Sequence, residues 1–121
     1  MSKFAQRIKE YIDEEITKAS VCRKQNDLAA AFHHLERAHV LGQSVTAQHV
    51  RVHLLMLKFG WLTKDWREIT GQIIRIIGAS AKTPFGIYPS GNTGGANVSP
   101  FKPLPIPNDL QTKLRLARKK D

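Results

Sequence analysis

The histidines of this chain are concentrated in one short stretch, since all five lie between residues 33 and 53. His49 and His53 are four residues apart, and Glu36 and His39 are three apart. Residues at these spacings share one face of a helix. Imidazole nitrogens and carboxylate oxygens are ligands that zinc, iron, nickel and copper accept. These four side chains therefore form a candidate site for a transition metal ion.

The segments that carry these ligands are predicted to be two helices joined by a short loop at about residues 42–45. A loop of this length makes the two helices antiparallel. His39 is then expected to face His49, with Glu36 and His53 one turn further from the loop. Such sites occur in the cores of helical bundles, and a haem held by the same histidines is the other cofactor that the pattern admits.

Other interpretations of the same residues stay open. In a structural interpretation, His39 and His53 are core histidines hydrogen-bonded to Glu36 or Glu15, and the other three histidines lie at the surface. Glu15 lies on the apolar stripe of an earlier predicted helix, which also makes it a reserve metal ligand. General acid or base catalysis by a histidine is a third possibility. No Ser-His-Asp arrangement follows from the spacing, and no catalytic residue is assigned, so an enzymatic activity is left open and not favoured.

The elements that must position the ligands are predicted from apolar spacing. Four helices are expected, and their bounds are Lys3 to about Arg23, a turn at residues 25–27 to Leu41, a cap at Ser44 or Thr46 to a stop at Gly60, and a cap at Thr63 to about Ala81. The third is apolar nearly all round and is expected to be the most buried. The fourth carries a stripe of Trp66, Ile69, Ile73 and Ile76.

The predicted fold class is all-α, with four main helices in two antiparallel pairs. Aligning Asp27 with Asp65 places Arg37 on Arg75, a loose repeat that makes a tetratricopeptide-like arrangement an alternative to a simple bundle. The whole chain, 1–121, is expected to be one domain, in which residues 1–82 form the helical bundle.

Residues 83–108 differ in composition, because all six prolines and four of the eight glycines lie between Pro84 and Pro107. Phe85, Phe101 and other large apolar residues are too many for a solvated linker, so this segment is expected to pack across the helices. Residues 109–121 are expected to form a short basic helix and tail.

Composition excludes several classes of protein. The 121 residues are 41% hydrophobic and carry a net charge of +9. One cysteine, Cys22, excludes an internal disulfide and a multi-cysteine metal site. No stretch has the length of a membrane span and no secretory leader is recognisable, so a cytoplasmic location is expected.

The basic excess is spread along the chain, with a local cluster at the C-terminus formed by Lys113, Arg115, Arg118, Lys119 and Lys120. Nucleic-acid binding is therefore expected to be absent or weak and non-specific. The class that competes with metal binding is a non-catalytic interaction module, which holds a protein partner in a tetratricopeptide-like groove or uses the basic terminus. The sequence leaves the oligomeric state open.

Three motifs carry a family resemblance. They are LERAHVLGQ at residues 35–43, the pair His49 and His53 before Leu55-Met56-Leu57, and GNTGGANVS at residues 91–99. Together they resemble a bacterial family of small helical proteins that is classed as a domain of unknown function, over most of residues 27–110. The resemblance implies a small bacterial helical protein and no particular activity.

Overall fold

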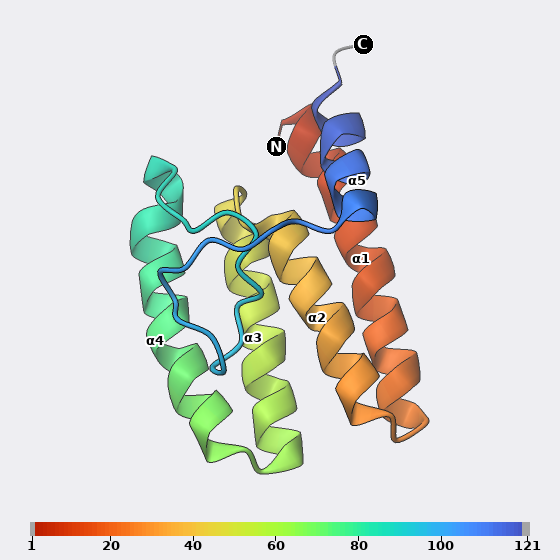
Figure 1. Cartoon of the computed structure of the whole chain (residues 1–121), viewed down its shortest axis with the longest axis vertical. Helices are drawn as coiled ribbons and strands as arrows, with labels where there is room; N and C mark the ends of the chain where they lie inside the picture. Colours follow the sequence, from red (N-terminus) through yellow and green to blue (C-terminus); the bar gives the residue numbers. More distant parts are fainter. Residues whose placement is uncertain (1, 120–121) are drawn as a thin grey trace.

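The computed structural model of the chain describes residues 2–119, and within that range it is helical, without strands. The elements are α1 (Lys3–Lys24), α2 (Leu28–Gly42), α3 (Thr46–Thr63), α4 (Trp66–Lys82), the short 3-10 helix η1 (Thr83–Phe85) and α5 (Asn108–Arg118). Helices α1 and α2 form one antiparallel pair, and α3 and α4 form the other (Figure 1). The predicted fold class is confirmed.

The hydrophobic core lies between α1, α2, α3 and α5. Its fully buried side chains are Ile8, Ile12, Ala38, Leu41, Val52, Met56 and Leu110. Helix α5 lies alongside the first half of α1 and closes the core there (Figure 1). Among the described residues, the core cluster draws no member from α4. The second helical pair is therefore held to the first by α3 and not by α4.

Two aspartates begin helices in equivalent ways. The side chain of Asp27 accepts a hydrogen bond from Ala30 N at the start of α2, and that of Asp65 accepts one from Glu68 N at the start of α4. Each satisfies an N–H that has no partner within its helix. The cap predicted at Thr63 is wrong, because α3 continues through Gly60 and ends only where Lys64 takes a left-handed conformation, with φ of 57°.

The start and the burial of α3 also differ from the prediction. Val45 holds the position before the helix and makes no side-chain cap, so neither Ser44 nor Thr46 acts as one. The helix is buried on one side only, since Leu54 is 51% exposed while His49 and His53 are buried. One face of α3 thus serves the core and the histidines, and the other faces solvent.

Helix α4 turns its polar side inward. Glu68, Gln72 and Ala79 are buried, whereas Trp66 and Ile73 are 65% and 50% exposed. The reason is that α4 packs against the histidine-bearing face of α3 and against the Pro/Gly-rich segment, both of which present polar groups. Half of the predicted apolar stripe consequently lies in solvent.

The Pro/Gly-rich segment after η1 crosses α3 and α4 and reaches α5, as its teal-to-blue trace shows in Figure 1. Packing across the helices is confirmed, but polar groups do most of the anchoring. The side chain of Gln43 donates to Pro89 O at 2.8 Å and accepts from Gly91 N at 2.8 Å. Phe85 and Phe101, which were expected to anchor the segment, are 80% and 73% exposed.

Across residues 2–119, every helix is too short or too polar to cross a membrane. Lys120, one member of the basic C-terminal cluster, lies outside the described residues.

Candidate metal centre

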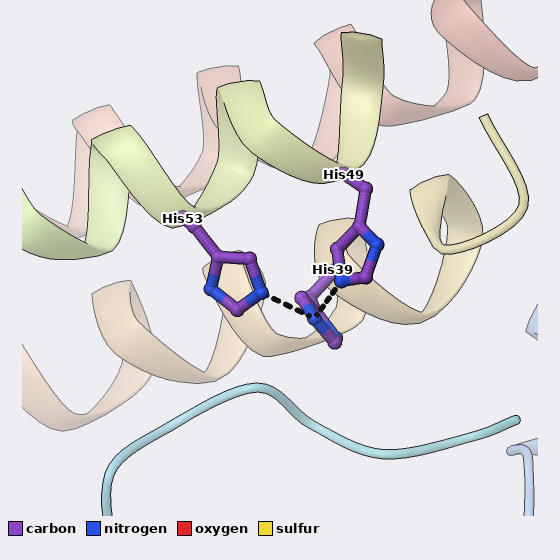
Figure 2. Close-up of side chains that lie close together, drawn as sticks. All are labelled: His39, His49 and His53. Atoms are coloured by element: carbon purple, nitrogen blue, oxygen red, sulfur yellow. Dashed lines mark hydrogen bonds between the residues drawn. The ribbon is translucent and has the colours of Figure 1, made fainter. Parts of the chain in front are cut away.

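Three histidines converge between α2 and α3, and their rings point toward one another (Figure 2). His39 comes from α2, while His49 and His53 come from successive turns of α3. The Nε2 atom of His39 is 3.1 Å from Nε2 of His49 and 3.1 Å from Nε2 of His53. All three residues are buried. His39 therefore lies between the other two rings, whereas the sequence spacing predicts it opposite His49 alone.

The Nδ1 atoms of two of the rings have hydrogen-bond partners that determine which ring nitrogen carries the proton. Nδ1 of His39 lies 2.7 Å from Asn92 O, and a backbone carbonyl can only accept. Nδ1 of His53 lies 2.6 Å from Gln72 Oε1. The amide nitrogen of Gln72 donates to Glu68 Oε1 and Gly94 O, which identifies its Oε1 as an acceptor. Both histidines thus carry the proton on Nδ1 and, when neutral, a lone pair on Nε2.

The partner of the third ring does not determine its tautomer. Nδ1 of His49 lies 2.7 Å from the hydroxyl oxygen of Thr83. A hydroxyl both donates and accepts. This freedom does not change the contact between the other two rings. In either tautomer of His49, the Nε2 lone pairs of His39 and His53 face each other at 3.1 Å without a proton between them.

The neutral state of the cluster follows from its burial. Burial first, and then the neighbouring His53, lower the pKa of His49 to about 4. Burial likewise lowers the pKa of His53 to about 4. The pKa of His39 is held well below its usual 6.5 by burial first and then by its two histidine neighbours. At neutral pH the rings are therefore uncharged, which is the form that binds metal ions.

The two predicted carboxylate ligands lie elsewhere. Glu36 Oε1 is 3.9 Å from the ring of exposed His33, and burial raises the pKa of Glu36 above its usual value. Glu36 does not belong to the group of converging ligand atoms. Its place on α2 is close to that of His39 in sequence, but its carboxylate takes part in a different contact.

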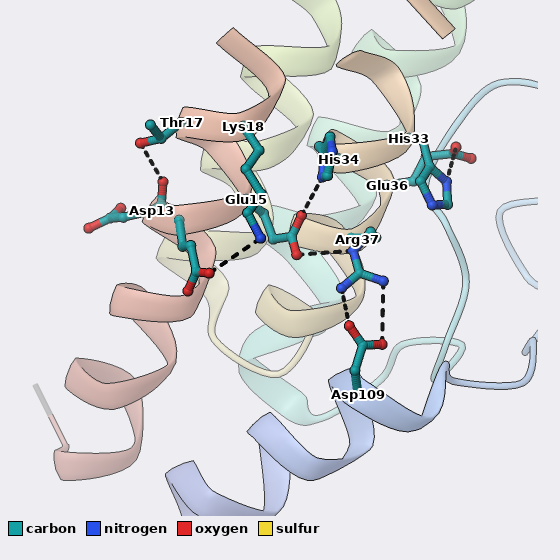
Figure 3. A network of polar contacts seen from close by, with 10 residues as sticks. Asp13, Glu15, Thr17, Lys18, His33, His34, Glu36, Arg37 and Asp109 are labelled. Atoms are coloured by element: carbon teal, nitrogen blue, oxygen red, sulfur yellow. Dashed lines mark hydrogen bonds and ion pairs between the residues drawn. The ribbon is translucent and has the colours of Figure 1, made fainter. Parts of the chain in front are cut away.

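Glu15 is the centre of a separate polar network (Figure 3). It is fully buried and accepts hydrogen bonds from His34 Nδ1 at 2.7 Å and Arg37 Nε at 3.0 Å. Arg37 also pairs with Asp109. Burial opposes ionisation of Glu15, but the hydrogen bonds from His34 and Arg37 outweigh it and lower its pKa. The network joins α1, α2 and α5, so Glu15 has a structural role.

The structural interpretation of the histidines is wrong in two details. His49, assigned there to the surface, is only 6% exposed. The partners of His39 and His53 are Asn92 and Gln72, and not Glu36 or Glu15.

Four residues that support the rings were not identified as site residues from the sequence, namely Gln72, Thr83, Asn92 and Gly94. Gly94 has φ of 84°, and a Cβ atom there would lie 2.6 Å from the His39 ring. Its backbone thus packs directly on that ring. The GNTGGANVS motif contains Asn92 and Gly94 and was the available signal, but no spacing rule connects it to histidines about fifty residues earlier.

Comparisons with known proteins give a family without an activity. No curated protein and no solved structure matches the chain significantly. One family model, described as "Protein of unknown function (DUF3703)", matches residues 6–114.

Proposed function

The chain belongs to the DUF3703 family, whose function is unknown, and we propose from the geometry of its own residues that it binds a transition metal ion. The ligands are the Nε2 atoms of His39, His49 and His53. Each oxygen partner on the far side of a ring would orient it and hold its lone pair inward, as partners of metal-bound histidines do.

The observation that carries the proposal is the pair of facing lone pairs on His39 and His53. Two acceptor nitrogens 3.1 Å apart repel each other when nothing positive lies between them. Zinc binds histidine nitrogen at about 2.0–2.1 Å, and at tetrahedral angles two such nitrogens lie roughly 3.3 Å apart. A separation of 3.1 Å is close to that value, so a cation would turn the repulsion into two bonds with little movement.

The donor set favours a single ion over haem. The axial ligands of a haem lie on opposite faces of the macrocycle, whereas these nitrogens face one another with no room for a ring between them. Three neutral imidazoles suit zinc, copper, nickel and iron. Zinc is the first ion to test, because three histidines and one open position make a common zinc site.

The experiment compares wild-type protein with His39→Ala and His33→Ala by isothermal titration with zinc at neutral pH. We expect one zinc per chain for wild type and for His33→Ala, whose ring is exposed on the same helix. His39→Ala is expected to lose at least about a hundredfold in affinity, because a ligand and the centre of the cluster are removed. Circular dichroism of each variant checks that the helices remain.

Because His39 is buried, His39→Gln serves as a second variant that fills the space without an imidazole. A zinc-dependent rise in melting temperature gives an independent measurement. An ion whose free concentration is about a hundred times its Kd stabilises the folded state by about 2.7 kcal/mol. The proposal is overturned if folded wild-type protein takes up no zinc, copper, nickel or iron, or if both His39 variants bind zinc as wild type does.

A further inference from the structure

A cavity of about 510 Å³ adjoins the histidine cluster, between α4 and the Pro/Gly-rich segment. His39, His49 and His53 all contribute to its wall. Lys82 and Phe101 also line it and are exposed to solvent, so the cavity reaches the surface. A volume in this range is typical of sites for small molecules, and it is far more than one metal-bound water needs.

The charged groups of this cavity are all cationic. Among the described residues, Arg75 and Lys82 are the charged side chains in its wall, and no aspartate or glutamate joins them. The ammonium of Lys82 lies 5.1 Å from the centre of the Phe101 ring, at the exposed side of the cavity. A bound divalent ion would add two further positive charges, since its three imidazole ligands are neutral. The site thus has an excess of positive charge that an anion would balance.

Within residues 2–119, no carboxylate accepts a hydrogen bond from the guanidinium of Arg75. Its Nη1 and Nη2 atoms donate to the carbonyls of Gly71 and Val98, at 3.0 and 2.7 Å. Its Nε is buried and has no hydrogen-bond partner within residues 2–119. Glu68 is the acidic residue that attracts Arg75, but its oxygens accept from Gln72 Nε2 and Ala96 N.

The remaining wall is largely apolar, with Ile74 and Ala79 from α4 and Ile87 and Phe101 from the crossing segment. Apolar walls favour an apolar ligand body, and convergent cationic groups favour an acidic head. A carboxylate satisfies both the arginine and the metal, because its two oxygens accept hydrogen bonds and also bind zinc.

We infer that this cavity binds a small organic carboxylate, with its acidic head toward the histidine-bound metal and Arg75 and its apolar body along Ile74 and Phe101. The inference rests on the proposed metal site, because the three histidines form the inner wall of the cavity. The ligand class follows from the positive charge, the volume and the apolar wall together.

The test uses the full-length protein loaded with cobalt, whose visible absorption changes when its ligands change. Hexanoate is titrated as the probe, and hexanamide, which has the same chain without the charge, is titrated as the control. We expect hexanoate to alter the cobalt spectrum and to bind at least about tenfold more tightly than hexanamide. Calorimetry on the same samples gives the affinity independently of the spectrum.

Two arginine variants of α4 distinguish binding of hexanoate in the cavity from a general effect of positive charge. Arg75→Gln is expected to weaken hexanoate binding by at least about tenfold. Arg67→Gln removes an exposed arginine of α4 that does not line the cavity, and it is expected to leave the affinity unchanged. If Arg75→Gln does not fold, Lys82→Gln replaces it and is expected to weaken binding at least about threefold.

The outcomes distinguish the two proposals. Failure of wild type to take up cobalt, zinc, copper, nickel or iron overturns the proposed function and this inference with it. If zinc binds and cobalt does not, hexanoate and hexanamide are compared by calorimetry on the zinc-loaded protein with the same criteria. Normal cobalt uptake with no response to hexanoate at about 10 mM overturns the inference alone. Equal binding of hexanoate and hexanamide, or equal effects of Arg75→Gln and Arg67→Gln, also overturns it.

Discussion

The contact between Gly94 and His39 shows how closely the backbone surrounds the cluster. Gly94 has a positive φ and lies against the imidazole ring, while its carbonyl accepts from Gln72, the partner of His53. Asn92, two residues earlier, supplies the carbonyl for His39 and the side-chain oxygen for Gly94 N. One short turn therefore orients two of the three rings.

Replacement of Gly94 by alanine is expected to weaken zinc binding by about 10- to 100-fold, the usual cost of disturbing the residues behind a metal ligand. The added Cβ would lie 2.6 Å from the His39 ring, and alanine disfavours φ of 84°. The strain should also lower the free energy of unfolding by about 1–3 kcal/mol. Titration with zinc and urea unfolding measure the two effects.

Gly78→Ala is the matched control, because a Cβ atom at that position in α4 meets nothing within 4 Å. It should keep wild-type zinc affinity and raise stability by up to about 1 kcal/mol through helix propensity. Equal zinc affinity in the two alanine variants would show that the contact between Gly94 and His39 does not matter for binding.

At the level of single residues, the sequence predicted the three converging histidines and not the residues that hydrogen-bond to them from behind. His49 and His53 share a helical face by spacing, and the short loop after α2 brings His39 opposite them, so local rules suffice. Asn92 and Gln72 reach the rings only through the path of a segment without periodicity. Glu36 has the right spacing from His39, but spacing does not fix which way a carboxylate turns.

Among the elements, the Pro/Gly-rich segment is held mainly by hydrogen bonds from its backbone. Gly91 N donates to Gln43 at the end of α2, Ala96 N donates to Glu68 of α4, and Leu104 N donates to Ser90 O within the segment itself. These bonds explain why a segment without regular structure can form one wall of the site. Its bulky residues contribute less, since Phe85 and Phe101 are mostly exposed.

Amide hydrogen exchange should therefore vary along this segment in a defined pattern. We expect slow exchange at Gly91, Gly94 and Ala96, whose N–H groups donate to buried or partly buried side chains. Exchange at Gly86, whose N–H donates to Thr83 O within an exposed turn, should be faster than at these three glycine and alanine amides. Zinc should slow exchange further at Gly94, because ordering of His39 also orders Asn92. Exchange as fast as in a free peptide throughout residues 86–104 would contradict this account.

Helix α4 shows why pattern reasoning succeeds for the element and fails for its orientation. The spacing of Trp66, Ile69 and Ile73 correctly indicates a helix, because the periodicity reflects local backbone geometry. It does not indicate which face is covered, since that depends on what the neighbouring elements present. Here the neighbours present histidines and backbone carbonyls, and the face with Glu68 and Gln72 is the one that packs.

For the molecule as a whole, the buried histidines make the stability of the metal-free protein depend on pH. The pKa values of His49 and His53 are about 4 in the folded chain, and an unfolded histidine titrates near 6.5. Between these values the unfolded state binds more protons, so the free energy of unfolding falls as the pH drops. The contribution is complete above pH 6.5 and is lost by about pH 4.

The measurement is urea unfolding of metal-free protein between pH 7.5 and 5, for wild type and His53→Gln. Over this range wild type should lose about 2 kcal/mol more than the variant, since each pKa unit corresponds to about 1.36 kcal/mol and pH 5 lies about 1.5 units below the pKa of an unfolded histidine. The difference between the two proteins removes the opposing effect of Glu36, whose raised pKa favours the folded state at low pH. Parallel curves for the two proteins would contradict the prediction.

The order of the site residues along the chain has a consequence for how the protein is made. The three proposed ligands lie between residues 39 and 53, whereas their oxygen partners lie between residues 72 and 92. A short hairpin closes at low entropic cost, and chains emerge from the ribosome N-terminus first. On the proposed function, a newly made α2–α3 hairpin offers all three imidazoles before their partners have emerged from the ribosome. The later segments would then close over an ion that is already bound.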